Sequence, residues 1–211
     1  SKDNNFGNGI SWYKNNGEGV FNSSNLVGFP PMEPGSVSAA DVDGDGDMDV
    51  LVAGTGDCAI VWYENDGSEN FSSNDIIMEG NWCPKDVSAA DVDGDGDMDV
   101  LSAVGGGGMN WYENDGSESF TGHSIATNVG IRSVYGVDID GDGDMDLLTI
   151  IDSDPDYDGI AWYENDGNES FTKHVITTSS PYVWIITIDA ADVDGDGNMD
   201  VLSASVYDDK I

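Results

Sequence analysis

"VSAADVDGDGDMDVL" occupies residues 37–51 and returns letter for letter at residues 87–101. Within each copy, nine residues follow the pattern D-x-D-G-D-G-x-x-D and carry five aspartates. Related nonamers begin at Asp138 and Asp192. Carboxylates held this close together repel one another unless a cation lies between them. The repeated stretch therefore raises the question of what neutralises its charge.

A second marker recurs with the same spacing. The residues Trp-Tyr, followed by Glu or Lys and then Asn, begin at Trp12, Trp62, Trp111 and Trp162. Both markers return roughly every 50 residues, which is typical of a repeat architecture. We therefore expect one domain over residues 1–211 that contains four repeats, at about 12–61, 62–110, 111–161 and 162–211.

Within a repeat the pattern predicts only β-strands. "VSAADV" leads into the acidic nonamer, "MDVLVAG" and "IVWYEN" are short apolar runs, and "FSSNDII" follows an NDG turn. No segment shows a capped apolar period of 3.6 residues, so no helix is expected. Four strands joined by short turns in a 50-residue period predict an all-β fold, a β-propeller of four four-stranded blades.

The predicted strands differ in composition. "MDVLVA" and "AIVWY" carry large apolar residues on both faces, as expected for sheets sandwiched between neighbouring blades. The Trp-Tyr pairs therefore belong to the predicted core. The first strand of each repeat ends in small residues, Ala39-Ala40 in the first copy and Gly136-Val137 in the third. This favours an innermost position, where the blades converge.

The chain ends are in register with each other. Ile211 stands where Ile10 and Ile60 stand, directly before the next Trp-Tyr strand, so the chain is cut between the second and third strands of a blade. The terminal strand pairs are therefore able to complete one blade. Three alternatives remain open: a closed four-bladed ring, half of an eight-bladed homodimer or higher self-association, and a fragment of a larger propeller.

The nonamer has the composition of a metal-binding loop. Carboxylates at positions 1, 3, 5 and 9 and a main-chain carbonyl at position 7 form a cage of oxygen ligands, and the glycine at position 6 permits a sharp turn. Oxygen ligands favour Ca²⁺ over Zn²⁺, so about four Ca²⁺ are expected, one per repeat. The predicted metal-site residues are Asp41, Asp43, Asp45, Asp47, Asp49, Asp91, Asp93, Asp95, Asp97, Asp99, Asp138, Asp140, Asp142, Asp144, Asp146, Asp192, Asp194, Asp196, Asn198 and Asp200.

Two other interpretations of the nonamer are weaker. An EF-hand requires a Glu at position 12 and flanking helices, whereas Val52 and Ser102 stand at that position between strands. A merely solvated acidic turn does not explain why positions 1, 3, 5 and 9 are aspartate in all four copies. The single irregular copy carries Asn198 at position 7, where the main-chain oxygen is the expected ligand.

Together, the D-x-D-G-D-G-x-x-D loops, the period near 50 and the "AWYEN"-like strands resemble the FG-GAP/VCBS family of integrin-α-like β-propeller repeats. The resemblance covers nearly the whole chain. It implies a calcium-stabilised propeller, commonly of seven or eight blades, and a bacterial-type protein that is secreted or lies at the cell surface. In blade number the chain departs from that pattern.

Composition narrows the class of partner. Six Lys and Arg against 42 Asp and Glu give a formal net charge of −36. This excludes nucleic acid as an expected partner and disfavours an anionic membrane surface. No apolar run is long enough to insert in a membrane. The predicted topology places Cys58 and Cys83 on the same face, which permits one disulfide in an oxidising compartment.

Residues that differ between repeats gather on the face opposite the acidic loops, as expected of a binding surface. The alternative is that they fill the mouth of the propeller. Asp152, Asp154 and Asp156 cluster there with Tyr157 and Arg132 and are the only candidates for acid-base chemistry. The candidate ligand-binding residues are Trp82, Arg132, Tyr157, Tyr182 and Trp184.

Three functions from different classes follow. The first is a non-catalytic adhesion or recognition module, in which Ca²⁺ is structural and the ligand is a glycan or an extracellular protein. The second is a polysaccharide lyase or hydrolase, which would need an acid-base pair on the variable face. The third is a structural, self-assembling repeat unit. No nucleophile, phosphate-loop or zinc motif supports the enzyme.

Overall fold

A computed structural model describes residues 9–29, 33–78, 83–154, 157–178 and 183–207. These residues form sixteen strands, and each strand pairs antiparallel with its neighbour in sequence. The prediction of an all-β fold is confirmed. In the described ranges, no helix is long and apolar enough to cross a membrane.

Three of the sheets have four strands each, in sequence order. The first contains β3 (Pro34–Ala40), β4 (Asp49–Gly54), β5 (Ala59–Asn65) and β6 (Phe71–Met78). The second contains β7 (Pro84–Ala90), β8 (Asp99–Val104), β9 (Gly108–Asn114) and β10 (Phe120–Thr127). The third contains β11 (Ile131–Val137), β12 (Asp146–Asp154), β13 (Tyr157–Asn165) and β14 (Phe171–Thr178).

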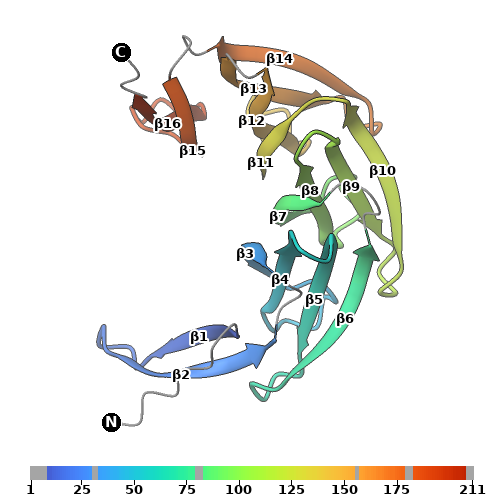
Figure 1. Cartoon of the computed structure of the whole chain (residues 1–211), viewed down its shortest axis with the longest axis vertical. Coiled ribbons are helices and arrows are strands. Elements are labelled where there is room, and N and C mark those ends of the chain that lie inside the picture. Colours follow the sequence, from blue (N-terminus) through green and yellow to red (C-terminus); the bar gives the residue numbers. More distant parts are fainter. Residues whose placement is uncertain (1–8, 30–32, 79–82, 155–156, 179–182, 208–211) are drawn as a thin grey trace.

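Two further sheets have only two strands. β1 (Ile10–Asn15) pairs with β2 (Phe21–Gly28), and β15 (Val183–Ala191) pairs with β16 (Asp200–Tyr207). Figure 1 shows the five sheets side by side along an open arc, with β1–β2 at one end and β15–β16 at the other. The two half-sheets do not pair with each other, so the sheets do not close into a ring within the described residues.

The hydrophobic core is divided among the gaps between adjacent sheets. One cluster joins Leu51 and Trp62 of the first complete sheet to Val100 and Tyr112 of the second. The other three clusters fill the remaining gaps along the arc in the same way. Side chains alternate across a strand, so each middle strand supplies two clusters at once. Apolar residues on both faces of these strands therefore explain the stacking of the sheets.

Small residues allow the inner strands to approach one another. β3, β7 and β11 lie on the concave side of the arc (Figure 1). A Cβ added to Gly136 of β11 would lie 2.5 Å from the Cβ of Ala90 in β7, closer than two carbon atoms can pack. The strand that ends in small residues is thus the innermost strand of each complete sheet, as predicted.

Strand alternation sorts the connections onto two rims of the arc. The β3–β4 and β5–β6 connections lie at one rim, and the β4–β5 and β6–β7 connections lie at the opposite rim. Cys58, in the β4–β5 turn, forms a disulfide with Cys83, which directly precedes β7. The disulfide therefore ties the first complete sheet to the second, at the rim away from the acidic loops.

Asp86 of β7 connects the inner strands of three successive sheets. Its Oδ1 accepts a hydrogen bond from Ser36 Oγ of β3 at 2.6 Å, and its Oδ2 accepts one from the main-chain N–H of Val134 in β11 at 3.1 Å. The carboxylate therefore satisfies donors on both neighbouring sheets. An apolar side chain at this position would leave the Val134 N–H without its acceptor.

We expect Asp86→Ala to lower the free energy of unfolding by about 1–3 kcal/mol, since a partly buried main-chain donor loses its partner. Asp86→Asn keeps an acceptor for Val134 and should lose less. Urea denaturation followed by tryptophan fluorescence measures both. Equal stability of Asp86→Ala and wild type would contradict this bridging role.

Candidate metal centre

The four acidic nonamers connect the first and second strand of each complete sheet and of the β15–β16 sheet. They span residues 41–49, 91–99, 138–146 and 192–200, so all four lie at the same rim of the arc. The glycines at positions 4 and 6 both have positive φ, +77° at Gly94 and +99° at Gly96 in the second loop, and the other loops repeat this. Position 4 therefore requires glycine for its backbone as well as position 6.

In each loop, the aspartate side chains accept hydrogen bonds from main-chain N–H groups of the same loop. In the second loop, Asp91 accepts hydrogen bonds from the main-chain N–H groups of Gly94 at 2.9 Å and Gly96 at 3.1 Å. Asp93 Oδ1 accepts from the N–H of Asp95, and Asp95 Oδ1 accepts from that of Asp97. These bonds hold the oxygens of positions 1, 3 and 5 on a tight turn whose shape is set by the aspartates themselves.

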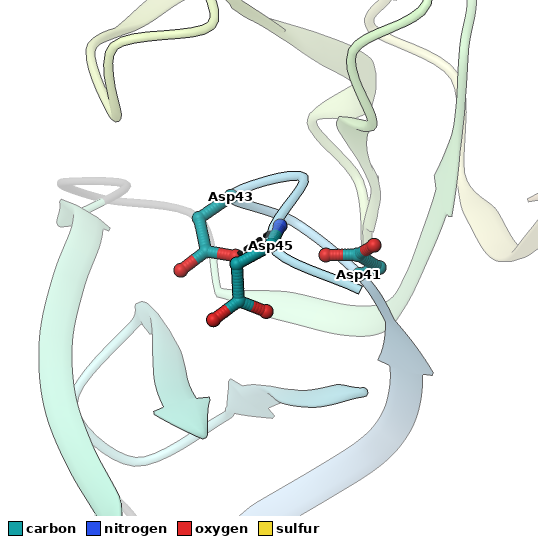
Figure 2. Close-up of side chains that lie close together, drawn as sticks. All are labelled: Asp41, Asp43 and Asp45. Atoms are coloured by element: carbon teal, nitrogen blue, oxygen red, sulfur yellow. Dashed lines mark hydrogen bonds between the residues drawn. The ribbon is translucent and has the colours of Figure 1, made fainter. Parts of the chain in front are cut away.

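Three carboxylates of each loop approach closely enough to share one cation. In each group, one oxygen from every residue lies within 4.8 Å of the others. Figure 2 shows the first group, in which Asp43 and Asp45 extend from the turn and Asp41 lies at its start. The groups are Asp41, Asp43 and Asp45; Asp91, Asp93 and Asp99; Asp138, Asp140 and Asp146; and Asp192, Asp194 and Asp200.

The side chains at position 7 do not belong to these groups. In the first three loops this aspartate lies against the glycine of the next hairpin turn, so that a Cβ on Gly116 would clash with the carboxylate of Asp97. The fourth loop carries Asn198, whose main-chain N–H still donates to Asp196. The side chain at position 7 is therefore positioned by contacts with the turns and not by the cluster of carboxylates. This is consistent with a position whose side chain is not a metal ligand, and it applies to Asp47, Asp97, Asp144 and Asn198.

The aspartate at position 9 has a structural role that the sequence analysis missed. Asp99 is fully buried, its Oδ2 accepts a hydrogen bond from the N–H of Val92 at 2.9 Å, and its Oδ1 accepts one from the N–H of Asn114 at 2.8 Å. Asp49 and Asp146 are bound in the same way. This carboxylate thus fastens the loop to the following hairpin, whether or not it also reaches a metal ion.

In the second and third complete sheets, the asparagine that ends the "WYEN" strand connects one loop to the next. The side-chain amide of Asn114 donates to the main-chain oxygen of Met98 in its own sheet, and to that of Val42 in the preceding loop at 2.8 Å. Asn165 donates to Met145 and Val92 in the same pattern. The asparagine recurs two residues after the Trp-Tyr pair in every repeat, and this recurrence was the sequence feature that could have indicated the contact.

Burial makes the metal-free loops electrostatically unfavourable. It raises the pKa of Asp49 and Asp146, and it raises the pKa of Asp99 to about 6, against the lowering effect of the main-chain hydrogen bonds. Burial also raises the pKa of Asp43 and Asp93, and neighbouring carboxylates add to the shift. A bound cation would relieve this cost, so the oxygen-only clusters fit a hard divalent ion.

The opposite rim holds the residues predicted to bind a ligand. Arg132 of β11 donates to the main-chain oxygen of Ile185 at 2.7 Å, pairs with Asp152 at 3.0 Å, and lies 5.7 Å from the ring centre of Trp184. These contacts hold β15 against the third sheet. Arg132, Asp152 and Trp184 therefore lie together at this rim, with the arginine engaged in packing. Trp82, Asp156, Tyr182 and the side chains of Asp154 and Tyr157 lie outside the described residues.

Comparison with known proteins agrees with the repeat pattern. The family described as FG-GAP-like repeat matches the chain four times, over residues 4–52, 41–102, 91–149 and 150–203. Together the matches include all four acidic loops. No curated protein matches the chain.

The raised pKa of Asp99 predicts a pH dependence in the metal-free protein. The folded state holds the proton of this carboxyl more tightly than the unfolded state, so the stabilisation is present below about pH 4 and is lost as pH rises through about 6. Relative to Asp99→Asn, whose amide does not titrate, the free energy of unfolding of wild type should fall by up to about 3 kcal/mol between pH 4 and pH 7.

Denaturation in chelator at both pH values measures this difference. The control is Asp97→Asn, which removes the same charge from the same loop at the position where the fourth loop carries Asn198. An equal pH effect in the control would show that the dependence does not come from Asp99.

Proposed function

Because the chain belongs to the FG-GAP-like repeat family, we propose that it is an extracellular, calcium-stabilised β-propeller module that binds a glycan or a protein without chemical turnover. The observation that carries the proposal is the recurrence of an oxygen-only cluster at the same loop of four successive sheets. The inner strands converge along the arc as the blades of a propeller do (Figure 1). The disulfide between Cys58 and Cys83 is compatible with an oxidising compartment.

Calcium in this proposal is structural. The residues that would hold it are the aspartates of the four groups, and a bound ion would offset the repulsion among carboxylates that the loop brings together. Extracellular calcium modules have dissociation constants of about 10⁻⁴ to 10⁻³ M, so each site would contribute roughly 0.5–1.5 kcal/mol at millimolar calcium. Four such contributions are comparable to the net stability of a domain.

Recognition is proposed for the rim opposite the loops. Trp184 is half exposed there, and its ring lies beside the guanidinium of Arg132, which is itself fixed by Ile185 and Asp152. An aromatic ring held in place by packing is a suitable surface on which a sugar ring or an apolar side chain can stack. The calcium loops and the ligand surface therefore occupy opposite rims, which separates stability from binding.

Calcium titration tests the structural part of the proposal. We expect about four sites by isothermal titration calorimetry and a melting temperature that falls in excess chelator. Asp140→Asn should remove one site, because Asp140 belongs to the third group and, among the described residues, accepts a single hydrogen bond, from the N–H of Asp142.

The matched control is Asp144→Asn, four residues further along the same loop. It should leave the number of sites unchanged, since Asn198 stands at this position in the fourth loop. A melting temperature that is insensitive to chelator would overturn the structural role of calcium.

A glycan array probed with the labelled chain in calcium tests the recognition part. We expect binding that Trp184→Ala weakens at least tenfold and that Phe21→Ala leaves unchanged. Phe21 is a similarly exposed aromatic residue, but it begins β2 at the rim of the acidic loops. Mass spectrometry of each bound glycan after incubation should find it intact, whereas cleavage products would support a polysaccharide lyase or hydrolase instead.

A further inference from the structure

Several repeated apolar residues are buried in the complete sheets and exposed only at the ends of the arc. Leu202 of β16 is 42% exposed, whereas Leu51, at the same repeat position in β4, is 0% exposed. Tyr13 of β1 is 59% exposed, whereas Tyr63 of β5 is 3% exposed. In the complete sheets, Leu51 packs against the following sheet and Tyr63 against the preceding one, so the sequence at both ends of the arc is that of a sheet with a neighbouring sheet on each face.

Two valines show the same contrast on the faces of the end sheets. Val37 of β3 is 60% exposed, and its counterpart Val87 in β7 is 3% exposed because β3 covers it. Val193 in the fourth loop is 62% exposed, and its counterpart Val42 is 2% exposed. The first complete sheet thus lacks an inner strand in front of it, and the fourth loop lacks the sheet that follows.

Polar groups at the two ends are also without the partners that the repeat supplies elsewhere. Asp200 Oδ2 accepts the N–H of Val193, but among the described residues no asparagine N–H reaches its Oδ1 as Asn114 reaches Asp99. Among the described residues, the side-chain amide of Asn65 donates only to Met48, and its buried Oδ1 has no partner. In the second and third sheets the equivalent asparagine also donates to the preceding loop.

These observations identify the missing groups at each end. β15–β16 is the inner half of a sheet, and β1–β2 is the outer half of one. Joined, they would place the N–H of Asn15 at Asp200 and the main-chain oxygen of Val193 at Asn65. The fourth acidic loop is therefore incomplete until a strand equivalent to β1 lies beside β16.

We propose that a second copy of this chain completes the arc, with β1 of each copy adding antiparallel to β16 of the other. The register follows from the complete sheets, in which Leu51 lies opposite Trp62 and Leu101 lies opposite Trp111. Leu202 then lies opposite Trp12, and Ser203 lies opposite Ser11. This is β-augmentation at two equivalent edges.

The shape of the arc favours a second copy over closure within one chain. In Figure 1 the two half-sheets stand at opposite ends of the arc, with the open side between them. A two-fold rotation brings the β1–β2 end of each copy to the β15–β16 end of the other, so both ends are satisfied by one symmetry operation. The product is a closed ring of eight four-stranded sheets in which no edge of this kind remains.

Net charge sets the conditions for this association. Each chain carries a formal net charge of −36, so two copies repel one another at low ionic strength. Divalent cations in the loops and added salt both reduce that repulsion. The dimer should therefore be strongest in millimolar calcium with moderate salt. The pairing of β1 with β16 does not depend on which ligand the opposite rim binds.

Light scattering after size exclusion measures the assembly. At tens of micromolar chain in calcium and 0.15 M salt, we expect twice the 22.3 kDa mass of one chain. Leu202→Asp should yield the monomer, because in the ring this side chain would lie beside Trp12 and be buried against the sheet that follows, as Leu51 is. The control Val175→Asp should remain dimeric: Val175 is also exposed on a strand, and Asp75 already stands at its repeat position.

Cross-linking tests the register and distinguishes the two modes of closure. The described residues contain no free cysteine, so Ser11→Cys combined with Ser203→Cys introduces a defined pair. Oxidation should give a covalent dimer, whereas Ser24→Cys with Ser203→Cys should not, because Ser24 lies on β2, on the far side of β1. A monomeric wild type, or a cross-link formed only within one chain, would overturn the proposal.

Discussion

The structure of each complete sheet depends on a buried carboxylate that accepts hydrogen bonds from the acidic loop and from the end of the third strand. Asp99 receives one N–H from its own loop and one from the end of β9, and it has no access to solvent. A buried charge is unfavourable unless it is hydrogen-bonded or paired with another charge. The same residue that orders the loop therefore also creates a need for positive charge nearby, which links the stability of the fold to an ion.

Adjacent sheets are then held together by three kinds of contact. The side chain of Asn114 donates a hydrogen bond to the loop of the preceding sheet. Asp86 accepts hydrogen bonds from the inner strands on both sides, and the apolar clusters fill the space between sheets. No sheet in the arc therefore has a core of its own. This is the arrangement expected of repeat architectures, in which a repeat becomes stable only when its neighbours cover it.

Much of this organisation could be predicted from the sequence, because it repeats. The strand order, the burial of Trp62 and Trp111, the small residues of the inner strands and the proximity of Cys58 to Cys83 all follow from period and alternation. The double role of Asp99 could not be predicted, since a pattern of ligands does not reveal which oxygen a main-chain amide occupies. The contacts of Arg132 were equally inaccessible, because they are made by residues at which the repeats differ: Lys85 and Gly35 stand at the position of Arg132.

The hydrogen bond from Asn114 to Val42 has a consequence for how the four loops respond to an ion. The acceptor belongs to one loop, and the donor belongs to the hairpin that anchors the next loop. Rigidifying one loop therefore lowers the entropy that its neighbour still has to lose, which is positive cooperativity without a change of shape. Within one chain, the first three loops therefore form a linear array in which each is coupled to its nearest neighbours.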